Sequence, residues 1–298
     1  MVKKFSHTGL DEKLYQLFIT LVTLFMSAIC LFPLLYILSL SLVNESEYIQ
    51  RGGFVLFPQN PTLMAYKRLF KGTVFLHALE ISIIRTILAI TLCVTMSVIA
   101  GYIVSRKYMP GRKIFIVMII TTILFTGGLI PTYLVVSALK LRDTIWALVI
   151  PGLIDSFNVL VLKQFFENVP LEVEESARID GIGEVALMVR ILVPMSLPAI
   201  AAISMFVGIN TWNSWFDAMI YINDSKLFPL TLLIRNSFVY SDLGSQFNPS
   251  SVIDPDNRVS TETLRMALVI FGTLPILSVY PFLQKYFKKG VYLGSVKG

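Results

Sequence analysis

The sequence has few charged residues and very few of the residues that metal and redox sites need. Of its 298 residues only 15% are Asp, Glu, Lys or Arg, two are cysteine and two are histidine. His7 and His77 stand alone, without HExxH or any other paired-ligand spacing, so no bound metal is expected. Cys30 and Cys93 lie inside apolar runs, which favours small core hydrophobes over a disulfide or a metal pair.

The sequence also lacks the phosphate-binding motif G-x-x-x-x-G-K-[ST]. Without that backbone cradle the chain is not expected to bind or hydrolyse ATP itself. The net charge is +6, but the basic residues form short clusters beside apolar segments. That distribution is typical of anchoring to membrane lipid at a cytoplasmic leaflet, and we expect no nucleic-acid partner.

Apolar residues make up 55% of the chain, and the mean hydropathy is +0.72, which is more than a soluble domain of this length can bury. The sequence therefore predicts an all-α integral membrane protein, because only helices or closed barrels satisfy every backbone polar group within hydrocarbon. Runs of about twenty apolar residues predict six transmembrane helices in a single domain, residues 1–298. Their approximate ranges are 14–43, 78–105, 114–137, 144–166, 197–222 and 263–287. Four prolines inside these ranges are each expected to kink or end a helix: Pro33, Pro131, Pro151 and Pro275.

Clusters of lysine and arginine predict the orientation of the spans. One cluster, 106–113, follows the second span, and another, 285–289, follows the sixth, which places both termini in the cytoplasm. Lys140 and Arg142 count against this orientation, because it leaves them outside. Two long outer loops result, 44–77 and 223–262. The second contains the apolar piece LFPLTLLIRNSF, which is expected to lie at the membrane interface or to pack on an outside partner.

One polar segment, NVPLEVEESARIDGIGEVALMVRILVPMSLP, interrupts the apolar pattern between spans 4 and 5. Pro170 suits the first turn of a short helix over about 170–179, and Gly181 permits the left-handed conformation that ends it. A second helix follows and is closed by Pro194 and Pro198. It carries one apolar face, formed by Ile182, Val185, Ala186, Val189 and Leu192. On these grounds alone, a two-helix connector without a partner and a docking surface are both open.

The residues from Glu175 to Pro194 resemble the EAA loop of binding-protein-dependent ABC importers, E-A-A-x-x-x-G-x9-I-x-L-P. Glu175, Ala177, Gly181, Ile191 and Pro194 match it; a serine replaces the second alanine and a valine the leucine. The ending KKGVYLGSVKG resembles the smaller maltose-type sugar permease. The fragments GGLIPTYL and WNSWFDAMIY are similar to carbohydrate permeases of the same family.

The resemblance implies a transport subunit of the bacterial cell membrane that imports a carbohydrate, expected to be an oligosaccharide. Its implied partners are a second homologous permease, two cytoplasmic ABC ATPase subunits and an extracytoplasmic solute-binding protein. ATP and Mg would be bound by the ATPases, with no cofactor in this chain. The coupling loop, 168–196, would dock on an ATPase, and the tail, 288–298, would reach between the ATPases. The implied coupling residues are Glu175, Ser176, Ala177, Asp180, Gly181, Ile191 and Pro194.

Polar and aromatic residues at membrane depth are the predicted substrate path, because such residues are costly in lipid and suit sugars. They are Asp155 and Asn158 in span 4, and Asn210, Trp212, Asn213 and Trp215 in span 5. Interfacial tryptophans and polar bonds between helices explain the same residues without a substrate. A non-sugar cargo is an alternative. So is a membrane-embedded hydrolase using Asp155 and Asp217, although no partner motif accompanies these acids.

Overall fold

The computed structural model describes residues 10–239 and 259–294, and within them every regular element is a helix. The predicted all-α class is therefore confirmed for this part of the chain. The described residues fall into two compact units, 10–71 with 259–271 and 72–239 with 272–294. The second unit contains the polar segment and the predicted substrate-path residues.

The first unit holds α1 (Leu10–Ser41), α2 (Glu45–Gln50), α3 (Met64–Lys71) and the first turns of α15 (Thr261–Gly294). Most apolar side chains of α1 are exposed, as is expected of a helix that faces lipid. A small core of Leu40, Val43 and Val55 closes the end of α1. Asn44 caps α2 by accepting a hydrogen bond from the backbone N–H of Glu47 at 2.8 Å.

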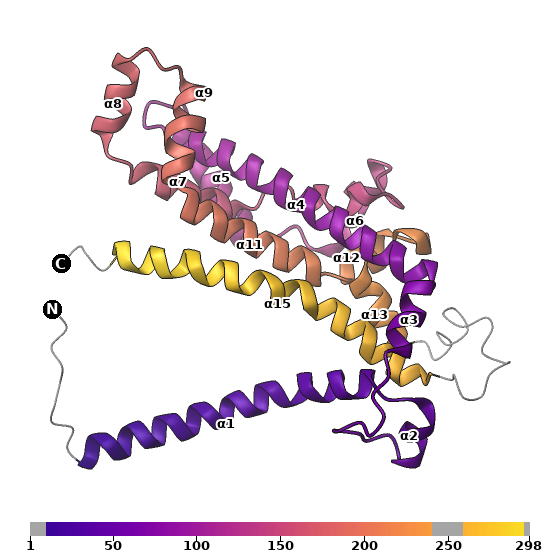
Figure 1. The fold of residues 1–298 in the computed structure, drawn as a ribbon. Coiled ribbons are helices and arrows are strands. Elements are labelled where there is room, and N and C mark those ends of the chain that lie inside the picture. Colours follow the sequence, from indigo (N-terminus) through magenta and orange to yellow (C-terminus); the bar gives the residue numbers. More distant parts are fainter. Residues whose placement is uncertain (1–9, 240–258, 295–298) are drawn as a thin grey trace. The chain divides into compact units, whose positions relative to one another are not determined.

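The second unit is arranged around α4 (Thr73–Ser105), which packs along α7 (Ser156–Glu167) and α11 (Leu197–Asn213) (Figure 1). Short helices α8 (Leu171–Ile179) and α9 (Glu184–Leu187) lie at one end of α4, and α12 (Phe216–Tyr221) lies nearer the other. The remaining elements are α5 (Arg112–Leu124), α6 (Leu129–Ala138), 3₁₀ turns at Ile145–Leu148, Ile150–Gly152 and Ser225–Leu227, a π-helical turn at Met188–Leu192, α10 (Val193–Met195) and α13 (Leu230–Val239).

Three helices in the described residues are long and apolar enough to cross a membrane, or up to six if each bent pair counts as one span. The third predicted span is broken: α5 and α6 meet at 114° after Leu124, and Gly128 has φ +80°. Pro131 lies in the first turn of α6, where its missing N–H leaves no helical bond unmade. The break was expected at Pro131 and lies a few residues before it, whereas the span boundaries themselves stay a prediction.

The apolar piece that contains α13 packs inside the chain. Leu230, Leu232 and Leu233 are buried, and the backbone N–H of Leu230 donates to Ser82 Oγ of α4 at 2.7 Å. The sequence predicted that this piece lies at the membrane interface or packs on an outside partner. It did not predict the contact with α4. Sequence periodicity could not identify α4 as the partner. The rest of the second outer loop, 240–258, lies outside the described residues, as does the end of the predicted tail, 295–298.

Gly101 marks the closest approach of α4 to α7. A Cβ at this position would lie 3.0 Å from Leu162 Cβ, 3.2 Å from Lys163 N and 3.2 Å from Val159 O. Two of these atoms are backbone and cannot rotate away. Gly101→Ala is expected to cost about 1–3 kcal/mol through overpacking. Gly127→Ala is the control, because nothing lies within 4 Å of its Cβ position. Thermal denaturation in detergent tests this, and equal midpoints in the two variants would contradict it.

Candidate functional site

The polar segment forms an elbow of two helical pieces. Helix α8 begins directly after Pro170, and the chain turns at Gly181, whose φ of +79° confirms the left-handed conformation that the sequence predicts. The second piece begins at Glu184, passes through the π-helical turn and ends at Met195. It meets α11 at 82°. The second helix of the prediction is present over nearly the same residues, but part of it is π-helical.

The predicted coupling residues divide by exposure. Glu175, Ser176, Asp180 and Gly181 are exposed on α8 and its end, and we call these four residues the elbow surface. Pro194 is also exposed, and Ile191 is half-buried. Ala177 is only 4% exposed and lies beneath the elbow surface. It therefore supports α8 from inside.

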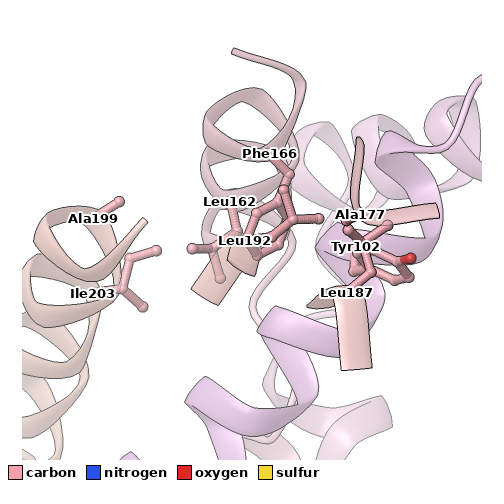
Figure 2. Close-up of a cluster of buried hydrophobic side chains, with 8 residues drawn as sticks. All are labelled: Tyr102, Leu162, Phe166, Ala177, Leu187, Leu192, Ala199 and Ile203. Carbon is pink, nitrogen blue, oxygen red and sulfur yellow. The ribbon is translucent and has the colours of Figure 1, made fainter. Parts of the chain in front are cut away.

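A hydrophobic core fixes the elbow to the long helices. Ala177 of α8 and Leu187 of α9 belong to the same buried cluster as Tyr102 of α4 and Phe166 of α7 (Figure 2). Leu192 from the π-helical turn packs into this cluster and is fully buried. The elbow is therefore part of the packed unit and not a free loop.

Charged side chains from the end of α4 and the following turn reinforce this attachment. Arg106 pairs with Glu174 of α8, and both residues are 8% exposed. The Tyr102 hydroxyl bonds to the Glu184 carboxylate at the start of α9, and Arg178 of α8 lies 2.9 Å from the same carboxylate. Their hydrogen bond and charge hold the pKa of Glu184 below its usual value. In the sequence, Arg106 was interpreted only as part of a topological signal, so its ion pair was not predicted.

A cavity of about 570 Å³, with a mostly apolar lining and several polar side chains, lies between α4, α7, α11 and α12. That volume falls within the range of small-molecule sites. Arg85 of α4 is 3% exposed and forms an ion pair with Asp217 of α12 at the cavity wall. Its guanidinium also donates to the backbone carbonyl of Ser214 at 3.2 Å. An arginine within a predicted span is a sequence signal of a functional site, but Arg85 was not among the predicted site residues.

The six predicted substrate-path residues separate into two groups. Asp155, Asn158 and Asn210 line the cavity. Trp212 is 7% exposed, and its indole N–H donates to the backbone carbonyl of Gly272 in α15 at 2.8 Å, so it joins two helices. Arg235 stacks over the ring of Trp215 at 4.5 Å. Among the described residues, the lining of this cavity includes neither tryptophan, and Asn213 does not border it either.

Asp143 ties the connection after α6 to the segment that follows α12. Its carboxylate accepts hydrogen bonds from Asn223 Nδ2 at 3.0 Å and from the backbone N–H of Asp224 at 3.2 Å, and it also bonds to the backbone N–H of Asn223. These hydrogen bonds lower the pKa of Asp143, and the bond from the backbone N–H of Asn223 has the largest effect. Its stabilising contribution is thus present above the unfolded pKa of about 3.9 and lost as the pH falls through the lower folded value.

Asp143→Asn is expected to loosen the segment after Tyr221. The exposed Lys226 in this segment is a trypsin site, and its cleavage should be about threefold faster in the variant, since local opening limits proteolysis. Arg142→Gln is the matched control, because Arg142 stacks over Tyr133 and acts on Asp143 through its charge alone, after the hydrogen bonds from Asn223 and Asp224. Equal cleavage rates at Lys226 in Asp143→Asn and in the unmodified chain would show that this anchor is unimportant.

Comparison with known proteins gives one family match over most of the chain and relatives that match nearly all of it. The family model for the binding-protein-dependent transport system inner membrane component matches residues 94–292. The protein LplC of Bacillus subtilis is 40% identical over 296 residues, which are 98% of this chain and 99% of LplC. The polygalacturonan/rhamnogalacturonan transport system permease protein YtcP of Bacillus subtilis is 36% identical over 289 residues, 97% of this chain and 100% of YtcP.

One solved structure is also similar over nearly the whole chain. It is a crystal structure of a bacterial ABC transporter involved in the import of the acidic polysaccharide alginate. The TM-score is 0.87 and the sequence identity is 25%, and the match covers 94% of this chain and 99% of that chain. The elbow lies within the matched family range, and so do the residues that line the cavity, apart from Arg85 and Cys93 of α4.

Proposed function

The chain belongs to the family of binding-protein-dependent transport system inner membrane components, and we propose that it is a transmembrane subunit of an ATP-driven importer of oligosaccharides. It is a multi-pass protein of the inner membrane. The observation that carries the proposal is the family match across the elbow, the cavity and the helices between them. The polysaccharide-derived cargoes for which YtcP and the alginate transporter are named support a carbohydrate cargo for this chain.

The elbow surface is the proposed docking site for a cytoplasmic ABC ATPase. It is exposed, it carries the carboxylates of Glu175 and Asp180, and the buried core beneath it holds its shape. A short helix packed in this way transmits a displacement better than a free loop does. ATP and Mg are then bound by two ATPase subunits, and this chain supplies no ATPase site. Both termini lie in the cytoplasm, with the tail at 288–298 near the ATPases.

The cavity is proposed to form one part of the sugar path. Asp155, Asn158 and Asn210 offer carboxylate and amide groups that hydrogen-bond to sugar hydroxyls. A second, homologous permease completes the path, and an extracytoplasmic binding protein delivers the sugar. Trp212, which joins α11 to α15, is assigned a packing role instead of sugar contact.

Co-expression with the neighbouring genes tests this function. The chain is expected to copurify with a second permease and an ATPase, and the complex with its binding protein should import trigalacturonate or maltotriose into proteoliposomes only when ATP is supplied. Uptake of the dipeptide Ala-Ala in place of both sugars would support the alternative cargo. Hydrolysis of these probes by the purified chain alone would support the hydrolase hypothesis. A chain that binds no ATPase would contradict the proposal.

A further inference from the structure

Tyr102 in the last turn of α4 and Arg106, the residue directly after α4, contact both halves of the elbow. Arg106 Nη1 lies 2.5 Å from Glu174 Oε2, and the guanidinium stacks over the Tyr102 ring at 4.6 Å. The Tyr102 hydroxyl bonds to the side chain of Glu184 and lies 3.2 Å from its backbone carbonyl. The end of α4 and the residue after it therefore bind α8 through an ion pair and α9 through a hydroxyl.

The grip on α8 is buried and specific. Glu174 and Arg106 are each 8% exposed, whereas Glu172 on the same helix and Lys107 beside Arg106 are exposed. Arg106 Nε is also satisfied, by Ser105 Oγ at 3.1 Å. Removing one partner of such a pair leaves a buried charge without compensation. Movement of α8 away from α4 is therefore unfavourable.

Further toward its N-terminus, α4 also forms part of the cavity wall. Helix α4 is uninterrupted from Thr73 to Ser105, and from Arg85 to Ser105 it rises about 30 Å. At Gly101 it fits closely against α7, and at Arg85 it pairs with Asp217 in the cavity wall. A displacement of the elbow end is thus carried by a rigid element to the cavity. Cys93, which also lines the cavity, lies on this helix between the two ends.

We propose that α4 is the lever that transmits movement of the elbow to the cavity, with Arg106 and Tyr102 as the positioning residues that attach it. The inference rests on the proposed function, since an ATPase must move the elbow. It goes beyond docking, because neither residue belongs to the elbow surface. When the ATPases bind ATP, α8 pulls Arg106, and the wall that contains Arg85 and Cys93 shifts against α7 and α11.

The native thiol of Cys93 reports the movement without knowledge of the sugar. In the assembled complex carrying Cys30→Ser, N-ethylmaleimide labelling of the Cys93 peptide is followed by mass spectrometry, with and without a non-hydrolysable ATP analogue and Mg²⁺. In the complex with no further substitution, nucleotide should change the labelling rate of Cys93 by about fivefold or more. Fivefold is the lower end of the usual coupling between two sites. Arg106→Gln and Tyr102→Phe should keep ATPase binding but lose most of this response.

Two comparisons separate attachment from general stability. Lys107→Gln changes the neighbouring exposed cation in the same way and should keep the full response. The charge swap Arg106→Glu/Glu174→Arg should regain assembly and much of the response that either single change removes. A normal response in both Arg106→Gln and Tyr102→Phe, or a charge swap that restores nothing, overturns the proposal. An unmodified complex that binds ATP without any change at Cys93 also overturns it, whereas failure to bind an ATPase refutes the proposed function instead.

Discussion

Asp217→Asn is expected to destabilise the protein by about 3–5 kcal/mol, the usual cost of leaving one member of a buried ion pair without its partner. The remaining charge is Arg85, which is 3% exposed inside α4 and has no counter-charge other than Asp217 among its described contacts. Its Nε atom is also buried without a hydrogen-bond partner among the described residues. Arg85→Met should cost less, because 26% of the Asp217 side chain is exposed at the cavity.

A double-mutant cycle isolates this interaction. Arg85→Met/Asp217→Asn should recover much of the stability that Asp217→Asn loses, because it removes the buried charge itself. Asp155→Asn is the matched control in the same cavity. Asp155 caps α7 by accepting from the backbone N–H of Asn158 at 2.9 Å, and asparagine caps about equally well. Denaturation midpoints in detergent give the comparison. Equal losses for Asp217→Asn and Asp155→Asn would refute the importance of the ion pair.

The apolar runs predicted most of the helical architecture because lipid requires long stretches with internally satisfied backbone. Local chemistry also located the elbow: Pro170 precedes α8 directly, and Gly181 adopts the left-handed conformation that favours glycine. These features depend on neighbours in the sequence. The break between α5 and α6 was expected at Pro131 and lies before Leu129, because both sides are apolar and hydropathy does not change where the chain bends.

Pairings between distant residues could not be predicted in the same way. Arg85 and Asp217 lie 132 positions apart, and Tyr102 and Glu184 lie 82 apart, so no periodicity relates them. Trp212 shows a second limit of sequence reasoning. Its chemistry suits a sugar, but whether an indole faces a cavity or a neighbouring helix depends on how α11 and α15 pack. Residue type selected six candidate positions for the substrate path, and tertiary packing places three of these residues at the cavity.

Glu175→Arg is expected to reduce ATP-driven uptake by at least about thirtyfold, because loss of a charge contact at an interface commonly costs 2–5 kcal/mol. Glu175 is exposed on α8, so the reversal leaves the hydrophobic core beneath it unchanged. Glu172→Arg makes the same change on an exposed carboxylate of the same helix and should reduce uptake much less. Copurification of the ATPase and uptake in proteoliposomes are the measurements, and equal uptake by the two variants would remove Glu175 from the docking role.

The neighbouring carboxylates Glu174 and Glu175 separate docking from transmission. Glu175 is exposed toward a partner, whereas Glu174 is buried against Arg106. Glu175→Arg should therefore lose the ATPase and, with it, every nucleotide effect on Cys93. Arg106→Gln should keep the ATPase and lose only the effect. If both changes instead released the ATPase to the same extent, the Arg106–Glu174 pair would only shape the docking surface, and transmission would have to run through another helix.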